Sequence, residues 1–86
     1  MTERVQVYTT HHCGYCVRAK ALLSRLNIAF KEVDVSDDPD TRDWLVSTSG
    51  QRTVPQIFID GRAIGGYVEL LAMERAGGLR DLAAAS

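Results

Sequence analysis

The first half of the chain places a strand, a helix and a second strand in succession, and this order most constrains the fold. Residues 4–9 form a short β-prone run, and apolar residues then recur at helical spacing between residues 19 and 26. The helix is expected to end near Asn27, which tolerates the left-handed backbone found past helix ends. Residues 30–35 are again strand-like. These features predict an α/β fold built on a βαβ unit, with two parallel strands joined by a right-handed crossover.

A second helix and a hairpin follow. Asp37-Asp38-Pro39 is typical of a helix start, with an acidic cap and then a proline where its missing N–H does no harm. This helix is expected to stop near Gly50. Asp60-Gly61 lies between the strand-like runs 57–59 and 62–64 and is a typical two-residue hairpin turn.

The remaining residues predict a further helix and complete the fold class. Gly65-Gly66 ends the last strand and begins a helix that Gly77-Gly78 terminates, and residues 79–84 favour a last short helix. The order βαβαββα predicts a single α/β layer structure, a four-stranded mixed sheet flanked by helices in which a hairpin adds antiparallel strands to the parallel pair. The length of 86 residues predicts a single domain spanning 1–86.

Composition narrows the class of protein. With 45% hydrophobic and 24% charged residues, the chain has the balance of a globular domain. A formal net charge of −1 argues against a dedicated nucleic-acid-binding protein. No apolar stretch approaches the ~20 residues that span a bilayer, and the N-terminus lacks the pattern of a secretory signal. A cytoplasmic location is expected, where thiols are kept reduced and a structural disulfide is unusual.

The stretch HHCGYC, residues 11–16, holds both cysteines and both histidines. A C-x-x-C motif beside a βαβ unit in a cytosolic chain is typical of a redox couple. Cys13 falls at the start of the first helix, where unpaired N–H groups and the helix dipole favour negative charge, so we expect it to be the thiolate nucleophile. Cys16 lies one turn later, inside the helix. It is positioned to attack a mixed disulfide formed at Cys13 and release the substrate.

Three other interpretations of the cysteines are weaker. Two buried thiols without chemistry are unexpected at a loop–helix junction that contains Gly14. A closed zinc site needs four ligands, and His11 and His12 would point in opposite directions on an extended backbone. Covalent haem attachment is excluded because Val17, not histidine, follows the second cysteine. The sequence therefore predicts no metal ligands other than those of the alternative given below.

The other polar residues near the motif have plain interpretations. His11 and His12 are expected to be a solvated loop pair, the functional alternative being that protonated His12 favours the Cys13 thiolate. Arg18 and Lys20 are expected to lie mostly on a solvated helix face, with a weaker role in the local positive field.

Several motifs, in the same order, resemble a bacterial dithiol glutaredoxin. They are residues 7–9, Cys13-Gly14-Tyr15-Cys16, residues 18–23, residues 53–61 and residues 64–66. The resemblance covers nearly the whole chain and implies the thioredoxin-like fold. It also implies glutathione-dependent reduction of protein disulfides and protein–glutathione mixed disulfides, with glutathione and disulfide-containing or glutathionylated proteins as partners.

The same resemblance implies a glutathione site. Val54–Pro55 is expected to be a cis peptide that faces Cys13, with the Val54 backbone pairing with the cysteinyl part of glutathione. Gly66, Tyr67 and Val68 correspond to the loop that holds the γ-glutamyl end, and Tyr15 flanks the ligand. The implied glutathione-binding residues are Cys13, Tyr15, Arg52, Thr53, Val54, Pro55, Gly66, Tyr67 and Val68.

The chain departs from the family pattern at two places. A lysine common before the first cysteine is replaced by Thr10, so Arg52 or Gln51 is expected to meet the glycyl carboxylate. An aspartate that meets the γ-glutamyl ammonium is replaced within Tyr67-Val68, which leaves Glu69 as the nearby acid. The sequence leaves open whether glutathione or another low-molecular-weight thiol is preferred.

Gly14 supports an alternative function. It replaces the proline usual between the cysteines, and in related proteins a glycine here accompanies a [2Fe–2S] cluster held by the first cysteine of two chains and two glutathione thiolates. By this resemblance Cys13 would be a cluster ligand and the chain an iron–sulfur carrier. The chain is expected to be a monomer, or a cluster-bridged homodimer under the alternative.

Overall fold

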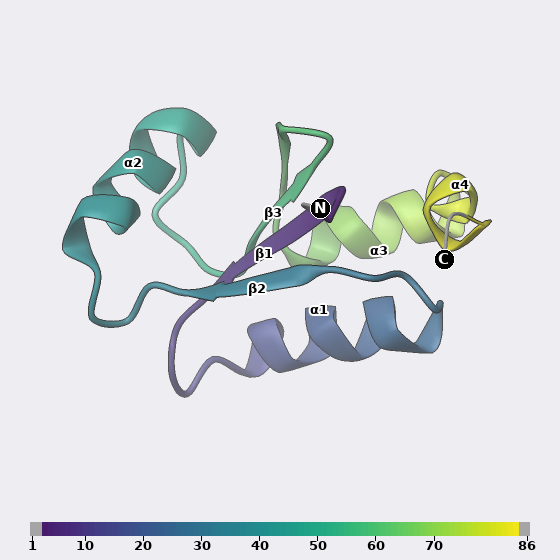
Figure 1. Ribbon diagram of the computed structural model, residues 1–86, viewed down its shortest axis with the longest axis horizontal. Helices are drawn as coiled ribbons and strands as arrows, with labels where there is room; N and C mark the ends of the chain where they lie inside the picture. The colour runs from purple at the N-terminus through teal and green to yellow at the C-terminus, as the bar shows by residue number, and fades with distance from the viewer. Residues whose placement is uncertain (1–2, 85–86) are drawn as a thin grey trace.

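A four-stranded mixed sheet forms the centre of the computed structural model, which describes residues 3–84 (Figure 1). The strands are β1 (Val5–Thr9), β2 (Lys31–Asp34), β3 (Gln56–Ile59) and β4 (Arg62–Gly65), arranged in the order β2-β1-β3-β4. β1 and β2 are parallel, while β3 is antiparallel to both β1 and β4. The predicted mixed sheet, with a parallel pair extended by a hairpin, is confirmed. The predicted domain 1–86 includes terminal residues 1–2 and 85–86, which lie outside the described residues.

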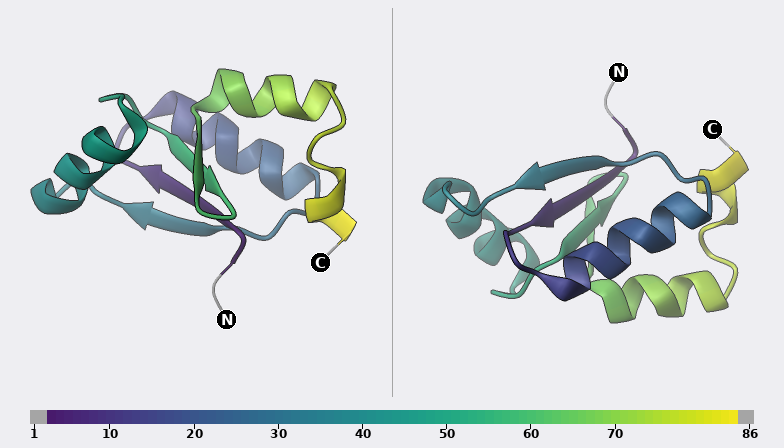
Figure 2. Two further views of the ribbon diagram at one scale, coloured as in Figure 1. Left: turned by 90° about the horizontal axis from the view of Figure 1, so that it is seen from above. Right: turned by 90° about the horizontal axis from the view of Figure 1, so that it is seen from below.

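Helices cover both faces of this sheet. They are α1 (Gly14–Arg25), α2 (Pro39–Ser49), α3 (Tyr67–Arg75) and α4 (Arg80–Ala84). Figure 2 shows α1 and α3 side by side on one face, with α2 on the other. None of the described helices has the length and apolar character needed to cross a membrane.

The helix ends follow from local chemistry. Asp38 caps α2, because its side chain accepts the Thr41 N–H at 3.1 Å, and Pro39 is the first helical residue. Asn27, just past α1, has a φ of 58°, and Gly50, at the end of α2, has a φ of 76°. All three predicted boundaries are confirmed.

The hairpin turn also matches its prediction. Asp60 and Gly61 have φ values of 52° and 81°, the positive pair that a tight two-residue hairpin turn requires. The Asp60 carboxylate accepts two hydrogen bonds of 2.8 Å from Arg4, which fastens the turn to the start of β1. The hairpin therefore holds β3 in its central position beside β1.

Two apolar clusters fill the two faces. Strand side chains alternate between them, so Val5 and Val7 face α1 while Tyr8 joins the α2 side. The larger cluster consists of Val5, Val7, Ala19, Leu22, Leu23, Ile28, Ile57, Leu70, Leu79 and Leu82. The smaller cluster consists of Val35, Leu45 and Phe58, and the ring of Trp44, 46% exposed, stacks on Phe58 at 5.5 Å. The larger cluster fixes the end of β1 and the start of α1, where the cysteines lie.

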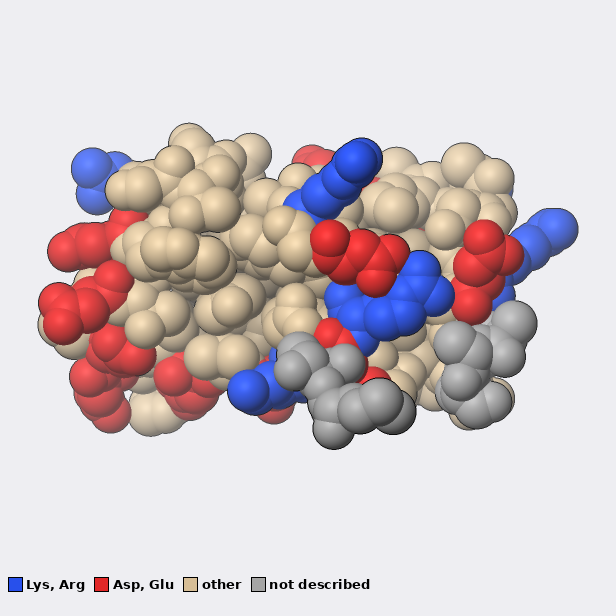
Figure 3. Space-filling model, turned by 45° about the horizontal axis from the view of Figure 1, so that its top comes forward, with Lys and Arg blue, Asp and Glu red and all other residues tan. Residues whose placement is uncertain are grey.

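Acidic side chains gather at the α2 end of the molecule (Figure 3). The exposed aspartates of this region are Asp37, Asp38, Asp40 and Asp43, before and within the first turns of α2. Negative charge is favourable near a helix N-terminus, so this patch has a structural explanation.

Candidate active site

Cys13 lies between the end of β1 and the first turn of α1. Its backbone is extended, with φ −109° and ψ 106°, and it is the N-cap residue of α1. The sulfur accepts the Cys16 N–H at 3.1 Å, and the Cys13 carbonyl accepts the Val17 N–H at 3.2 Å. The predicted position at the helix start is confirmed, with a backbone donor directed at the sulfur.

Cys16 has different surroundings. Its side chain lies within the first turn of α1 and is 1% exposed, and both cysteines are free thiols. The pKa of Cys16 is raised to about 12, chiefly by burial and then by hydrogen bonding to Cys13, and the Thr10 backbone and the Lys20 charge oppose this rise. Cys16 is therefore a protonated thiol near neutral pH, and the prediction that it is the less exposed cysteine is confirmed.

The loop before β3 faces the first cysteine. Val54–Pro55 is a cis peptide bond, as predicted. The Cys13 thiol donates to the Val54 carbonyl oxygen at 3.6 Å, which brings residues 41 positions apart in the chain into contact. The Val54 backbone is thus positioned next to the sulfur that is expected to react.

A groove beside this contact brings together most of the predicted glutathione residues. Its walls come from the start of α1, the loop before β3 and the start of α3. The lining residues are Tyr15, Thr53, Val54, Pro55, Gly66, Tyr67, Val68 and Glu69. Tyr15 and Tyr67 have ring centroids 6.2 Å apart, and the Arg18 guanidinium lies 5.4 Å from the centre of the Tyr15 ring. Tyr15 and Val68 are 56% and 66% exposed, so the groove presents apolar side chains to solvent.

Glu69 has a defined role at the edge of this groove. Its Oε1 accepts the Gly66 N–H at 2.7 Å, which caps the start of α3. The N–H groups of Tyr67 and Val68, in the first turn of α3, have no partner within the helix itself. The backbone therefore retains donors beside the groove, while the only carboxylate of the groove lining is engaged by Gly66.

Arg52 does not line the groove. It lines a neighbouring pocket below α2, which shares Thr53 and Val54 with the groove. The other candidate, Gln51, is engaged: its Oε1 accepts a hydrogen bond of 3.2 Å from Gln56 Nε2. Both residues are exposed and line this neighbouring pocket.

Sequence reasoning missed Gln56. Its side chain is 1% exposed, and Nε2 donates to the Thr53 carbonyl at 2.8 Å. It thus ties the loop that carries Val54 to the first residue of β3. The available signal was a single amide within the otherwise apolar strand Gln56–Ile59.

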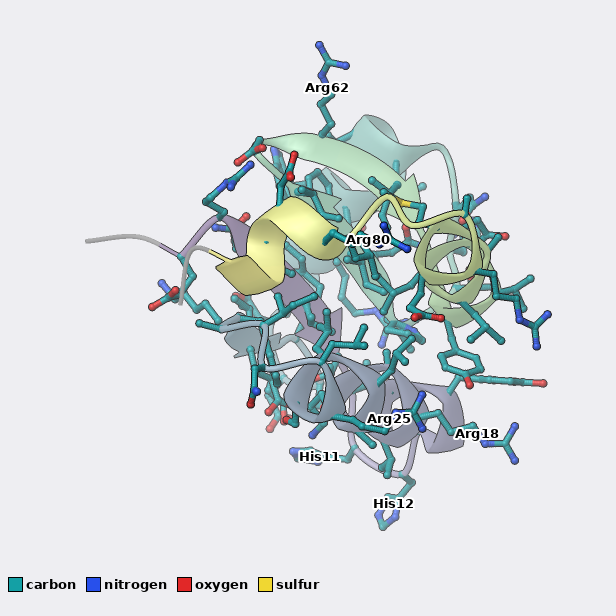
Figure 4. All side chains as sticks on the ribbon, turned by 90° about the vertical axis from the view of Figure 1, so that its right-hand side faces the viewer. His11, His12, Arg18, Arg25, Arg62 and Arg80 are labelled. Carbon is teal, nitrogen blue, oxygen red and sulfur yellow. The ribbon has the colours of Figure 1, made fainter. Side chains whose placement is uncertain are left out.

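The two histidines lie on a turn, and the predicted extended backbone is wrong. His12 has a φ of 57°, which reverses the chain between β1 and α1. His11 donates its backbone N–H to Ser36 Oγ at 2.7 Å, and its Nε2 lies 2.9 Å from Asp34 Oδ2. Figure 4 shows both rings at the same end of the molecule, with His12 pointing away from it. Within residues 3–84 no group of three or more metal-ligating side chains is present.

Lys20 is 32% exposed and is paired with an acid that the sequence analysis did not anticipate. Its Nζ donates to Glu32 Oε2 at 2.9 Å, and the same oxygen accepts the Thr9 hydroxyl at 2.9 Å. The hydrogen bond from Lys20 holds the pKa of Glu32 below its usual range. The pairing could not be predicted from α1 alone, because β2 places Glu32 opposite Lys20.

The iron–sulfur alternative stays a prediction. Cys13 is partly exposed and Cys16 is 1% exposed, so of the two cysteines Cys13 is the one accessible from outside the chain. A Cβ added at Gly14 would meet nothing within 4 Å. The structure around Cys13 therefore has room for a side chain at position 14, and sterics give no reason for a glycine there.

A thioredoxin-like fold with a partly exposed cysteine at a helix start and a buried cysteine one turn later is typical of a thiol–disulfide oxidoreductase. The chain belongs to the glutaredoxin family, whose sequence profile, described as Glutaredoxin, matches residues 5–64.

Individual relatives agree with this assignment. Glutaredoxin 3 of Escherichia coli is 45% identical over 78 residues, covering 91% of this chain and 94% of the relative. A glutaredoxin of Pseudomonas aeruginosa is 44% identical over 81 residues, covering 94% of this chain and 96% of the relative. The crystal structure of a buckwheat glutaredoxin–glutathione complex superposes with a TM-score of 0.86 at 32% identity, covering 95% of this chain and 77% of that one.

Proposed function

We propose that the chain is a glutathione-dependent oxidoreductase that reduces protein disulfides and protein–glutathione mixed disulfides in the cytoplasm. One observation carries the proposal: the Cys13 sulfur lies 3.6 Å from the Val54 carbonyl at a groove formed by the start of α1, the loop before β3 and the start of α3. The buckwheat relative that binds glutathione has the same fold, which supports glutathione as the co-substrate.

The first step is attack by Cys13. The thiolate of Cys13 attacks one sulfur of a substrate disulfide; a new disulfide joins Cys13 to that sulfur, and the second substrate sulfur leaves with the electron pair and takes a proton from water. The Cys16 N–H, 3.1 Å from the Cys13 sulfur, stabilises the thiolate before attack.

The second step has two forms. With a protein disulfide, Cys16 attacks Cys13, the Cys13–Cys16 disulfide forms, and the substrate leaves as a thiol. Two glutathione molecules then reduce this disulfide and leave as glutathione disulfide. With a glutathione mixed disulfide on Cys13, a second glutathione thiolate resolves it directly, and Cys16 is not needed.

The groove, together with the neighbouring pocket that Arg52 lines, offers a binding partner for each part of glutathione. The Val54 backbone pairs with the cysteinyl residue, and the N–H groups of Tyr67 and Val68 receive the γ-glutamyl carboxylate at the start of α3. Tyr15 packs along the ligand, and Arg52 meets the glycyl carboxylate. Val68 supplies no carboxylate for the ligand's ammonium group, so we expect weaker glutathione binding than an aspartate would give.

Steady-state turnover of a glutathionylated peptide tests the proposal. Glutathione, cysteine and cysteamine are compared as reductants at equal thiolate concentration, with the mixed disulfide consumption followed directly by chromatography. Glutathione is expected to give the fastest turnover, and to saturate. Absence of turnover with every thiol would contradict the oxidoreductase function, and equal turnover with all three would contradict a dedicated glutathione site.

A further inference from the structure

A second pocket lies on the other side of the cysteine pair from the groove. It is formed by the turn after β1, the start of α1 and the adjoining edge of β2. Both cysteines line it, together with the charged or titratable side chains of His11, His12, Lys20, Glu32 and Asp34. The charged pocket therefore includes both cysteines, and the groove adjoins Cys13 through Val54.

Lys20 is the cation of this pocket nearest to Cys16 along α1. The two residues are four positions apart in the same helix, a spacing that makes side chains neighbours, with Cβ atoms about 5–6 Å apart. Lys20 Nζ is fixed by Glu32 Oε2 at 2.9 Å, and Glu32 is fixed in turn by the buried Thr9 hydroxyl. Lys20, on the same face of α1 as Cys16, is thus fixed by a β2 carboxylate that β1 also holds.

The other charged groups are engaged elsewhere or face away. Asp34 Oδ2 lies 2.9 Å from His11 Nε2, and Asp34 also accepts the Ser36 N–H at 2.8 Å. His12 is exposed and points out of the molecule (Figure 4). Glu32 is bound to Lys20 itself. Lys20 is therefore the one permanent positive charge that the pocket lining offers to Cys16.

We propose that Lys20, held by Glu32, is a positioning residue that stabilises the negative charge on Cys16 when Cys16 resolves the mixed disulfide. The inference rests on the proposed function, in which Cys16 is the resolving thiol. It adds a residue that acts on substrate release and not on substrate binding. The burial that raises the pKa of Cys16 to about 12 makes such assistance useful, because few Cys16 thiolates exist at neutral pH.

The chemical step is a proton loss followed by disulfide exchange. Cys16 gives its proton to water or buffer in the open pocket, and Lys20 compensates the resulting negative charge. The Cys16 sulfur then attacks the Cys13 sulfur; the Cys13–Cys16 bond forms, the bond from Cys13 to the substrate breaks, and the substrate sulfur leaves with the electron pair and is protonated by water. Two cysteine thiols are oxidised and one substrate disulfide is reduced.

Reaction of the reduced protein with dithiobis(nitrobenzoate) separates the two thiols in time. The first release of coloured thiolate reports attack by Cys13, and the second reports displacement by Cys16. Replacing Lys20 by Met is expected to slow the second phase about threefold: loss of a neighbouring charge lowers the thiolate fraction about tenfold, and a more basic sulfur recovers about a factor of three in reactivity. The first phase should change by less than about 1.5-fold.

Three variants and the pH profile test whether charge is the cause. Lys20→Arg keeps the charge and should restore the second phase, and Arg25→Met, which removes a charge at the far end of α1, should leave it unchanged. Glu32→Gln keeps an acceptor for Thr9 and Lys20 while removing a negative charge, so the second phase should become slightly faster. In every variant the rate of the second phase should rise about tenfold per pH unit between pH 7 and 9. The reason is that the Cys16 thiolate fraction rises about tenfold per unit below the pKa of Cys16.

The outcomes separate the inference from the function beneath it. No first phase would contradict the nucleophile assignment and with it the proposed function. A normal first phase with a second phase unchanged by Lys20→Met would overturn the inference alone. If Glu32→Gln slowed the second phase as much as Lys20→Met, the inference would also be overturned. The ion pair would then act by holding the structure in place, and the positive charge would not be the cause. Slowing by Lys20→Met, with rescue by arginine, supports the inference.

Discussion

The groove and the charged pocket differ in chemistry although both lie next to Cys13. On one side the groove carries exposed aromatic and aliphatic side chains, Tyr15, Tyr67 and Val68, and backbone donors. On the other side the pocket carries paired charges, Lys20 with Glu32 among them. The groove is suited to recognising a partner thiol, and the pocket is suited to stabilising a charge that appears during reaction.

This contrast teaches that selection and release can be tuned independently. Cys13 is partly exposed; it lines the pocket and contacts Val54, which lines the groove, whereas Cys16 lines the pocket alone and is 1% exposed. Changes in the groove should therefore alter which disulfide reaches Cys13, and changes in the pocket should alter how quickly Cys16 displaces it. Each prediction below tests one half of this separation.

The largest effect is expected from Cys13→Ser. Because Cys13 is the more exposed of the two cysteines and contacts Val54 of the groove, its loss should abolish reduction of protein disulfides and of glutathione mixed disulfides, by at least about a thousandfold. Steady-state assays with one substrate of each kind measure this. Cys16→Ser is the matched control, and retained turnover in the Cys13 variant would contradict its role.

Cys16→Ser should divide the two activities. Reduction of a protein disulfide should fall at least about a hundredfold because the internal resolving thiol is gone, while reduction of a glutathione mixed disulfide should stay within a few-fold. The same two substrates are assayed side by side. An equal loss of both activities would show that Cys16 is needed for every reaction. The division of substrate selection and release between the groove and the pocket would then be wrong.

A smaller effect is expected from Tyr15→Ala, in the groove. Loss of the ring should raise the KM for a glutathionylated peptide about fivefold, equivalent to roughly 1 kcal/mol of contact, with kcat nearly unchanged. The release phase measured with dithiobis(nitrobenzoate) should not change. A slower release phase would mean that the groove and the pocket are not separate.

The smallest effect is expected from Val68→Asp, which should improve binding. An added carboxylate beside the groove should lower the KM for glutathione about threefold, a modest gain because the position is 66% exposed. The control is Val17→Asp, the same substitution at a residue 61% exposed on the pocket side, which should not lower the KM for glutathione. A lower KM with Val17→Asp would mean that negative charge near the cysteines favours glutathione binding wherever it is placed.

Features governed by neighbouring residues could be predicted from the sequence. Asp38 before Pro39, Asn27 after an apolar helix and Asp60-Gly61 between two strands each determine a local backbone shape, and each is found where expected. The position of Cys13 at the start of α1 belongs to the same group, because it depends only on where that helix begins.

Features that join distant segments of the chain were harder to predict from the sequence. The pairing of Lys20 with Glu32 depends on how β2 lies beside β1, and no local pattern reports that register. The turn at His12 arises because the chain must pass from the end of β1 into α1, against the preference of an ordinary side chain for negative φ. The groove residues could be listed only through the family resemblance, since they come from three separate segments.

The stacking of Trp44 on Phe58 has a practical consequence for anyone who studies this chain by spectroscopy. Trp44 is the sole tryptophan, and it lies on α2, across the sheet from α1. Its emission should therefore report the detachment of α2 from the sheet during unfolding and respond little to oxidation of the cysteines. Tyr15, within the active site, is the natural place for an engineered fluorophore that follows redox state.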